Sequence, residues 1–190
     1  MLYKGEAVPV GEDQVQHIEL SREIARKFNQ RYGETFPDPV ELLSEAPRIM
    51  GLDGKTKMSK SLGNYISLVE TPESIGKKLA TAVTDENRKR RADTGNPDIC
   101  NLFTLHKHFS QKEQIGRVNT ECRTAGIGCV ECKKILTENV VAALNPIREK
   151  YEGLIRDQGY LTDLLRSCAK KCKAIAENTM ADVRRKMGLR

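Results

Sequence analysis

Two lysines three residues apart, in a run of small and flexible residues, are the part of this chain best suited to chemistry. Lys57 and Lys60 lie in the sequence Lys-Met-Ser-Lys-Ser at residues 57–61, the lysine motif. Two ammonium groups on a loop can close over a triphosphate and neutralise the charge that develops as pyrophosphate leaves. A solvated turn is the alternative for an isolated Lys-x-x-Lys pair, but the complete motif favours nucleotide binding. The motif therefore indicates adenylate-forming chemistry.

Four cysteines form a second set of residues that could do chemistry. Cys100, Cys122, Cys129 and Cys132 are separated by 21, 6 and 2 residues, and two nearby glycines permit tight backbone turns. Clustered cysteines in a chain expected in the cytosol favour a metal over disulfides. Thiolates suit both zinc and iron-sulfur clusters, and the irregular spacing favours a 4Fe-4S cluster with zinc as the alternative. Ordinary reduced core cysteines are the interpretation without a metal.

A strand, a turn and a helix are expected ahead of the lysine motif. The apolar run at residues 7–10 predicts the end of a short buried strand, and Gly11 permits a turn after it. Apolar residues at helical spacing predict a helix over residues 13–32 that ends at Gly33. Asp13 then lies at a helix N-terminus, where it could cap the helix or bind a ribose.

The rest of the chain is predicted to be mostly helical. Three prolines within residues 34–47 predict an irregular connection or a short helix. A turn signal at Asp53-Gly54 lets the lysine motif project from the body of the protein. Further helices are predicted over residues 73–83, 101–109, 132–153 and 160–187.

The charge is unevenly distributed along the 190 residues. The net charge is +6 overall, but −2 over residues 1–70 and +8 over residues 71–190, with the densest basic cluster at residues 88–91. A basic half indicates a polyanionic partner such as nucleic acid. With no Trp and 5% aromatic residues, extensive stacking on bases is not expected. No apolar run is long enough for a membrane span and no secretory signal is present, so a cytoplasmic location is expected.

Several segments together resemble the bacterial tryptophanyl-tRNA synthetases. The lysine motif alone indicates only a class I synthetase. Residues 8–17, Val-Pro-Val-Gly-Glu-Asp-Gln-Val-Gln-His, narrow the resemblance to the tryptophan enzyme, and residues 48–50, 81–85 and 95–97 agree. The four-cysteine pattern resembles the subgroup that carries an iron-sulfur cluster in its anticodon-binding region. The resemblance extends over nearly the whole chain.

The resemblance implies a two-domain architecture that is mainly helical overall. It implies an α/β remnant of a Rossmann-type catalytic domain over residues 1–70, followed by an all-helical anticodon-binding domain over residues 71–190. The implied reaction activates tryptophan with ATP and Mg²⁺ and transfers it to its tRNA. The implied intact enzyme is a cytoplasmic homodimer with no membrane segment.

The same resemblance assigns site residues by motif match. Gly11, Glu12 and Asp13 are expected to line the ribose side of ATP, and Ile49 to meet adenine through its backbone. Lys57 and Lys60 are expected to stabilise the transition state. The phosphates are expected to contact the whole lysine motif, Lys57, Met58, Ser59, Lys60 and Ser61. The metal ligands implied are Cys100, Cys122, Cys129 and Cys132.

The chain departs from the family in one respect, since no His-x-Gly-His or similar motif is present. That motif supplies the other half of the phosphate site. The sequence is therefore expected to be a C-terminal portion of the enzyme that cannot activate tryptophan alone. The alternatives are a non-catalytic module that binds the tRNA anticodon and a metal, and a tyrosyl-type class I synthetase. A cluster-based redox sensor would leave the lysine motif unexplained.

Overall fold

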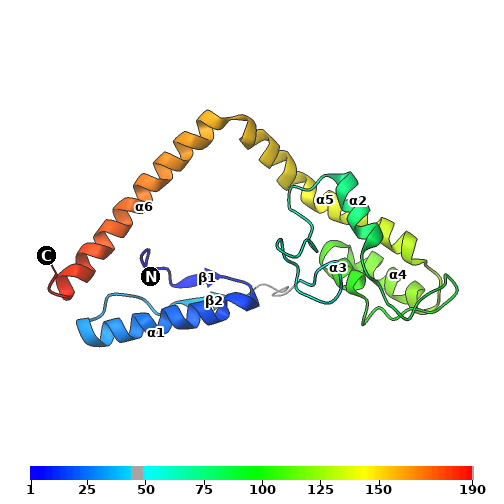
Figure 1. The fold of residues 1–190 in the computed structure, drawn as a ribbon, viewed down its shortest axis with the longest axis horizontal. Helices are drawn as coiled ribbons and strands as arrows, with labels where there is room; N and C mark the ends of the chain where they lie inside the picture. The colour runs from blue at the N-terminus through cyan, green and yellow to red at the C-terminus, as the bar shows by residue number, and fades with distance from the viewer. Residues whose placement is uncertain (44–48, 190) are drawn as a thin grey trace. The chain divides into compact units, whose positions relative to one another are not determined.

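The computed structural model describes residues 1–43 and 49–189. The chain divides into two compact units (Figure 1). Unit 1 consists of Met1–Arg48 and Asp157–Arg190, and unit 2 consists of Ile49–Arg156. Unit 1 is therefore built from two separated stretches of sequence, whereas unit 2 is continuous.

A two-stranded parallel sheet opens unit 1. Strand β1, Ala7–Pro9, pairs with β2, Val40–Leu42, in a register that sets Ala7 opposite Val40. The predicted strand is confirmed in position, but the prediction that it is buried is wrong, since Ala7 and Pro9 are exposed and Val8 is half-buried. The prediction of an irregular connection or short helix over residues 34–47 is wrong at β2, because a three-residue strand is specified by its partner rather than by a local pattern. Residues 44–47 of that prediction, and Arg48, lie outside the described residues.

The helix predicted over residues 13–32 is confirmed as two elements. A 3-10 turn η1, Glu12–Gln14, leads into α1, Val15–Tyr32, which connects the two strands. Gly33 follows α1 with φ +90°, a conformation that favours glycine, so it ends the helix as expected.

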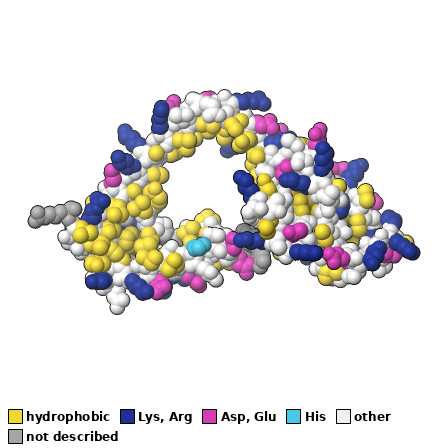
Figure 2. Space-filling view, in the orientation of Figure 1, with side chains coloured by type: hydrophobic (Ala, Val, Ile, Leu, Met, Phe, Trp, Pro, Cys, Tyr) yellow, Lys and Arg dark blue, Asp and Glu magenta, His cyan; other side chains and the backbone are white. Residues whose placement is uncertain are grey.

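The long helix α6, Gln158–Lys186, completes unit 1. Val183 of α6 forms a small core with Ala25 and Phe36. The ammonium of Lys186 donates to the carbonyl of Glu34 at 2.5 Å and to the Thr35 hydroxyl at 2.9 Å. Most of the side chains along α6 are exposed. Figure 2 shows yellow hydrophobic side chains on the surface of this unit.

Four helices pack around the core of unit 2. They are α2 (Pro72–Thr81), α3 (Asn101–Phe109), α4 (Lys112–Arg123) and α5 (Cys129–Arg156). Three of them, like α6, were predicted to within a few residues. The helix α4 was not, because it has few apolar residues, and only Val118 of these is fully buried. The most buried core side chains are Ile75, Leu79, Leu102, Ile127, Leu136 and Val140.

The predicted fold class holds at a coarse level, since the chain is mainly helical with a small parallel sheet. The two compact units do not coincide with the domain ranges 1–70 and 71–190, and that domain assignment stays a prediction. Among the described residues, every helix is too short or too polar to cross a membrane.

Candidate functional site: a lysine loop and a cysteine cluster

The lysine motif continues from a tight backbone hairpin anchored to the core of unit 2. Met50 and Lys57 form an antiparallel bridge. The Gly51 amide donates to the carbonyl of Thr56 at 2.8 Å, and the Met58 amide donates to the carbonyl of Ile49 at 2.9 Å. The side chains of Ile49 and Met58 are half-buried and pack against the core. These hydrogen bonds and packing contacts attach the hairpin, and with it the start of the lysine motif, to the core of unit 2.

Asp53 stabilises the tip of this hairpin. One carboxylate oxygen accepts from the backbone amides of Lys55 and Thr56 at 3.0 and 3.1 Å, and the other accepts from the Thr56 hydroxyl at 2.8 Å. The bond from the Lys55 amide, followed by those from Asn64 and Thr56, holds the pKa of Asp53 well below its usual value. Asp53 is therefore a carboxylate throughout the physiological range. Gly54 beside it has φ +65°, which explains the glycine at this turn.

Asn64 connects the hairpin to the lysine motif. Its side-chain oxygen accepts from the Ser59 amide at 2.8 Å. Its side-chain nitrogen donates to Asp53 Oδ2 and Thr56 Oγ1, both at 2.9 Å, and to the Lys57 carbonyl at 3.2 Å. Asn64 is 8% exposed. From the sequence it was assigned no role, although it follows the motif by three residues and comes directly after Gly63.

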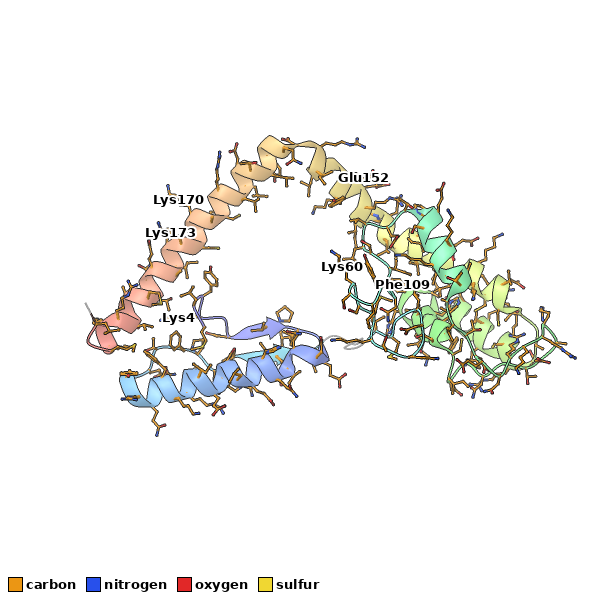
Figure 3. The ribbon with its side chains drawn as sticks, in the orientation of Figure 1. Lys4, Lys60, Phe109, Glu152, Lys170 and Lys173 are labelled. Carbon is orange, nitrogen blue, oxygen red and sulfur yellow. The ribbon has the colours of Figure 1, made fainter. Side chains whose placement is uncertain are left out.

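Three of the five residues of the lysine motif are exposed. Lys57, Lys60 and Ser61 are exposed, while Met58 and Ser59 are half-buried. The hydroxyls of Ser59 and Ser61 lie 2.8 Å apart and share a hydrogen bond. Lys60 lies on the loop at the edge of unit 2 (Figure 3). This arrangement leaves two ammonium groups on one exposed loop, which suits an anion such as a polyphosphate.

The other predicted ATP residues lie in unit 1. Gly11 has extended backbone and accepts the first bond of η1, from the Gln14 amide at 2.9 Å. Glu12 and Asp13 are exposed. The residue at the cap position of α1 is Gln14, and no side-chain hydrogen bond caps that helix, so the interpretation of Asp13 as a cap is wrong. A shared ATP site between these residues and the lysine motif stays a prediction.

The four predicted metal ligands all lie at or near helix ends in unit 2. Cys100 precedes α3, Cys122 is in the last turn of α4, and Cys129 and Cys132 are in the first turn of α5. Burial raises the pKa of Cys132 to about 12, and the thiols at positions 100, 122 and 129 act in the same direction. Burial, with the thiols of Cys100 and Cys129, also raises the pKa of Cys122. Neighbouring thiols therefore add to the rise at both of these cysteines.

The side chains as they stand do not form a closed ligand set. Within residues 1–43 and 49–189, no three His, Cys, Asp or Glu side chains form a group that could hold a metal ion. Cys132 Sγ instead lies 3.3 Å from Nε2 of the buried His106. A Cβ on Gly95 would approach Cys122 Sγ to 2.6 Å, so this sulfur needs a glycine beside it. The residue types fit a thiolate site, and the metal itself stays a prediction.

Arg88 is a structural residue of the cysteine region. It is 9% exposed, and its guanidinium donates to the carbonyl of Ile127 at 2.7 Å and to that of Arg91 at 3.1 Å. It also approaches Cys122 Sγ at 3.7 Å. This positive charge beside the sulfur partly opposes the rise in the pKa of Cys122. Arg88 thus ties the loop before α5 to the segment before α3.

Of the other three residues in the basic cluster, one holds a loop in place and two are exposed on the surface. Arg91 donates to the carbonyls of Ala125 and Gly126 and so holds the same loop. Lys89 and Arg90 are exposed, and no hydrogen bond or ion pair is recorded for their side chains among the described residues. They line a cavity of about 510 Å³ that also includes Lys134 and Glu131. Figure 2 shows further dark-blue Lys and Arg side chains on the surface of this unit.

The chain is similar to known tRNA synthetases over its whole length. The family of class I tRNA synthetases (W and Y) matches residues 1–145. A tryptophan–tRNA ligase from Deinococcus radiodurans is 50% identical over 99% of this chain and 57% of its own length. One from Aquifex aeolicus is 44% identical over 100% of this chain and 48% of its own.

Solved structures give the same result. A tryptophanyl-tRNA synthetase from Campylobacter jejuni, complexed with ADP and tryptophan, matches with a TM-score of 0.79 and 33% identity. One from Mycoplasma pneumoniae matches with a TM-score of 0.74 and 29% identity. Each match covers 100% of this chain and 59% of the solved chain. The chain therefore spans roughly half the length of the relatives it matches.

Proposed function

The chain belongs to the class I tRNA synthetases that include the tryptophan and tyrosine enzymes, and on this premise we propose that it is part of a tryptophan–tRNA ligase. The proposed reaction activates tryptophan with ATP and Mg²⁺ and transfers it to its tRNA. Identities of 50% and 44% to two tryptophan–tRNA ligases favour this amino acid. Because the relatives are longer, the complete activity is proposed for an enzyme that contains this chain.

The observation that carries the proposal is the geometry of the lysine motif. Its backbone is held by the hairpin and by Asn64, while Lys57 and Lys60 are exposed residues. Ammonium groups on a preformed loop can stabilise charge that develops on a departing pyrophosphate without much reorganisation. We therefore assign phosphate binding to residues 57–61 and transition-state stabilisation to the two lysines.

The remaining nucleotide contacts follow from motif position. We assign the ribose side of ATP to Gly11, Glu12 and Asp13, and the adenine contact to the backbone of Ile49. The Ile49 carbonyl already accepts the Met58 amide at 2.9 Å, so an additional contact would use its second lone pair or its own amide. Mg²⁺ would be held mainly by the phosphates, since this ion usually binds through substrate oxygens.

The reaction can be tested in a chimera with a longer relative. The matching segment of the Deinococcus radiodurans ligase is replaced by this chain, and tryptophan-dependent exchange of pyrophosphate into ATP is measured. We expect exchange in the chimera and a loss of about 100-fold with Lys60→Ala. Lys170→Ala, an exposed lysine on α6, serves as the matched control. A folded chimera without exchange would contradict the proposal, and exchange with tyrosine instead would favour the tyrosyl alternative.

The chain alone is expected to be inactive, because it has no His-x-Gly-His motif. The same exchange assay on the purified chain tests this expectation. Measurable tryptophan-dependent exchange by the chain alone would refute it.

We further propose that unit 2 binds tRNA through the exposed part of its basic cluster. Lys89 and Arg90 are better candidates than Arg88 and Arg91, whose guanidinium groups bind backbone carbonyls. Phosphate contacts of this kind are weakened by salt and lost on charge reversal. A chain that binds tRNA without catalysis, the alternative module, would rest on this surface as well.

A tRNA gel shift tests the tRNA proposal. Lys89→Glu with Arg90→Glu is expected to weaken binding at least about tenfold. Lys170→Glu with Lys171→Glu makes the same change of charge on α6 and is the control. Equal losses in both variants would mean that total charge, rather than this surface, controls binding.

We propose a metal site at Cys100, Cys122, Cys129 and Cys132. A 4Fe-4S cluster is the first candidate and zinc is the alternative, because both bind thiolates. A bound cation would favour the thiolate forms that burial and crowding of the sulfurs disfavour. Support comes from the positions of the four cysteines at or near helix ends in unit 2, where neighbouring thiols add to the raised pKa of Cys122 and Cys132.

The metal content of protein purified without oxygen tests this site. About four irons and four sulfides per chain are expected for the cluster, and one zinc without sulfide for the alternative. Cys168→Ser, an exposed cysteine on α6, is the control for Cys129→Ser. Absence of both metals would leave the four residues as ordinary reduced cysteines.

Three expectations about the intact enzyme also belong to this proposal. They are a Rossmann-type catalytic domain that includes residues 1–70, an anticodon-binding domain over residues 71–190, and a cytoplasmic homodimer. Light scattering on the chimera tests the dimer.

A further inference from the structure

We infer that Asn64 is a positioning residue for the lysine motif, and that its side-chain amide sets the path of the backbone from which Lys57 and Lys60 project. This inference rests on the proposed phosphate role of the motif. The Asn64 side chain binds the motif at two backbone groups, the Ser59 amide and the Lys57 carbonyl, so it acts on the backbone that carries the two lysines.

The two ends of the Asn64 amide bind two points of the motif. The oxygen accepts from the Ser59 amide at 2.8 Å, and the nitrogen donates to the Lys57 carbonyl at 3.2 Å. The one residue between these points is Met58, whose side chain packs against the core. A single planar group therefore holds both sides of Met58, which restricts the backbone that carries the two lysines.

The same nitrogen is tied to the hairpin. It donates at 2.9 Å to Asp53 Oδ2 and to Thr56 Oγ1. With the Lys57 carbonyl this makes three acceptors for two hydrogens, so at least one hydrogen is shared. Asp53 is itself fixed by the amides of Lys55 and Thr56. Asn64 therefore connects the backbone of the motif to the hydrogen-bonded tip of the hairpin and restricts its movement.

The space around Asn64 fits an Asn side chain closely. A Cβ added to Gly51 would lie 2.0 Å from the Asn64 nitrogen and 2.5 Å from its Cγ. Asn64 is also fixed by its own backbone, since its carbonyl accepts the Leu52 amide at 2.9 Å. The glycine at position 51 is thus explained by contact with this amide, because its backbone does not require a positive φ.

The first test is hydrogen exchange on the chain itself, without nucleotide or tRNA. In Asn64→Ala, we expect the Ser59 amide to lose protection by about tenfold or more, because its acceptor is gone, and the other protected amides of residues 56–61 to lose protection as the hairpin loosens. Protection in α2 and α5 should stay unchanged. Asn139→Ala is the matched control, since Asn139 donates to Ser110 at 2.8 Å and to Gln114 at 2.9 Å elsewhere in unit 2. Unchanged exchange at residues 56–61 would overturn the inference.

Exchanging the hydrogen-bond donor and acceptor between positions 64 and 53 tests whether Asn64 positions the motif or only fills space. Asn64→Asp is nearly isosteric and keeps an acceptor for the Ser59 amide, but it sets a carboxylate oxygen against Asp53 and the Lys57 carbonyl, so we expect a smaller loss of protection than with Ala. Adding Asp53→Asn restores a donor opposite an acceptor at the hairpin but not at the Lys57 carbonyl, so the double variant should regain part of the protection. A residue needed only to fill space would show neither effect, and failure of the double variant to regain any protection would overturn the role of the amide.

Binding of inorganic tripolyphosphate tests whether Asn64 supports the proposed phosphate site. We expect it to shift the amide resonances of residues 57–61 in the unaltered chain, and to bind at least about tenfold more weakly to Asn64→Ala. Equal binding by both proteins would overturn the positioning role. No response in the unaltered chain would contradict the proposed phosphate site instead, while the exchange experiment would still decide the role of Asn64.

Discussion

The loop segment of residues 49–64 and the cysteine region of residues 88–132 both belong to unit 2, but their polar groups are satisfied in different ways. In the loop segment, the chain supplies its own partners, since Asp53 and Asn64 pair with backbone and hydroxyl groups. In the cysteine region, burial raises the pKa of Cys122 and Cys132, and neighbouring thiols add to both rises. Arg88 and Arg91 there bind carbonyls rather than forming a complete partner set for the thiols.

The difference indicates how each region would respond to its proposed ligand. The loop segment is organised before any phosphate arrives, so binding need not order its backbone. The cysteine region has its sulfurs near one another, but their charged forms are unfavourable until a cation is present. We therefore expect ligand to change the stability of the cysteine region more than that of the loop segment.

The largest effect is expected from Arg88→Ala, which breaks the cysteine region. Removal of this buried side chain leaves the Ile127 carbonyl without its bond at 2.7 Å. We expect a loss of about 3 kcal/mol, measured by hydrogen exchange in α3 and α5. The exposed Arg90→Ala is the control and should change stability by no more than about 0.5 kcal/mol. Similar small effects for both variants would contradict the structural role of Arg88.

A smaller loss of stability is expected from Gly51→Ala, which disrupts the loop segment. The added Cβ would meet the Asn64 nitrogen at 2.0 Å and displace it. We expect a cost of about 2 kcal/mol and lost protection at residues 56–61. Combined with Asn64→Ala, the cost should be less than additive, because the clash is then removed. Strict additivity would show that the two residues do not act on each other.

A pH-dependent effect of about 1 kcal/mol is expected at Glu70, which follows the loop segment. Burial opposes its ionisation, but bonds from Lys78 at 2.6 Å, Ser74 and the Ser67 amide outweigh it and lower the pKa from 4.5 to about 2. A lowered carboxyl pKa stabilises the fold above pH about 4.5, and this contribution is lost as the pH falls towards 2. Glu70→Gln should therefore cost about 1 kcal/mol at pH 7 and nothing near pH 2. A difference that persists at pH 2 would contradict this origin.

The smallest effect on stability is expected from Lys60→Ala. Its side chain is exposed and no bond is recorded for it among the described residues. The free energy of unfolding should change by no more than about 0.5 kcal/mol, measured by urea unfolding. With the loss of activity expected in the chimera, this would separate function from stability at this position. A large destabilisation would mean that Lys60 holds the loop rather than serving the substrate.

The sequence predicted elements that depend on local signals. The periodic apolar residues of α1, and Gly33 after it, allowed that helix to be predicted to within a few residues. The strand β2 was missed because its pairing with β1 is a contact across α1, and α4 because only a few of its residues face the core. The roles of Arg88 and Asn64 depend on carbonyls and amides of other segments, which no sequence pattern reveals.

Unit 1 is built from two separated stretches of sequence, and this affects the order in which the chain can fold. The bond from Lys186 to the Glu34 carbonyl joins residues 152 positions apart, and everything between residues 49 and 156 belongs to the other unit. During synthesis from the N-terminus, unit 2 can become compact before α6 has been made. Its collapse shortens the effective length of the connection, which lowers the entropic cost of bringing α6 to α1. Substitutions that slow the folding of unit 2 should therefore also delay the completion of unit 1.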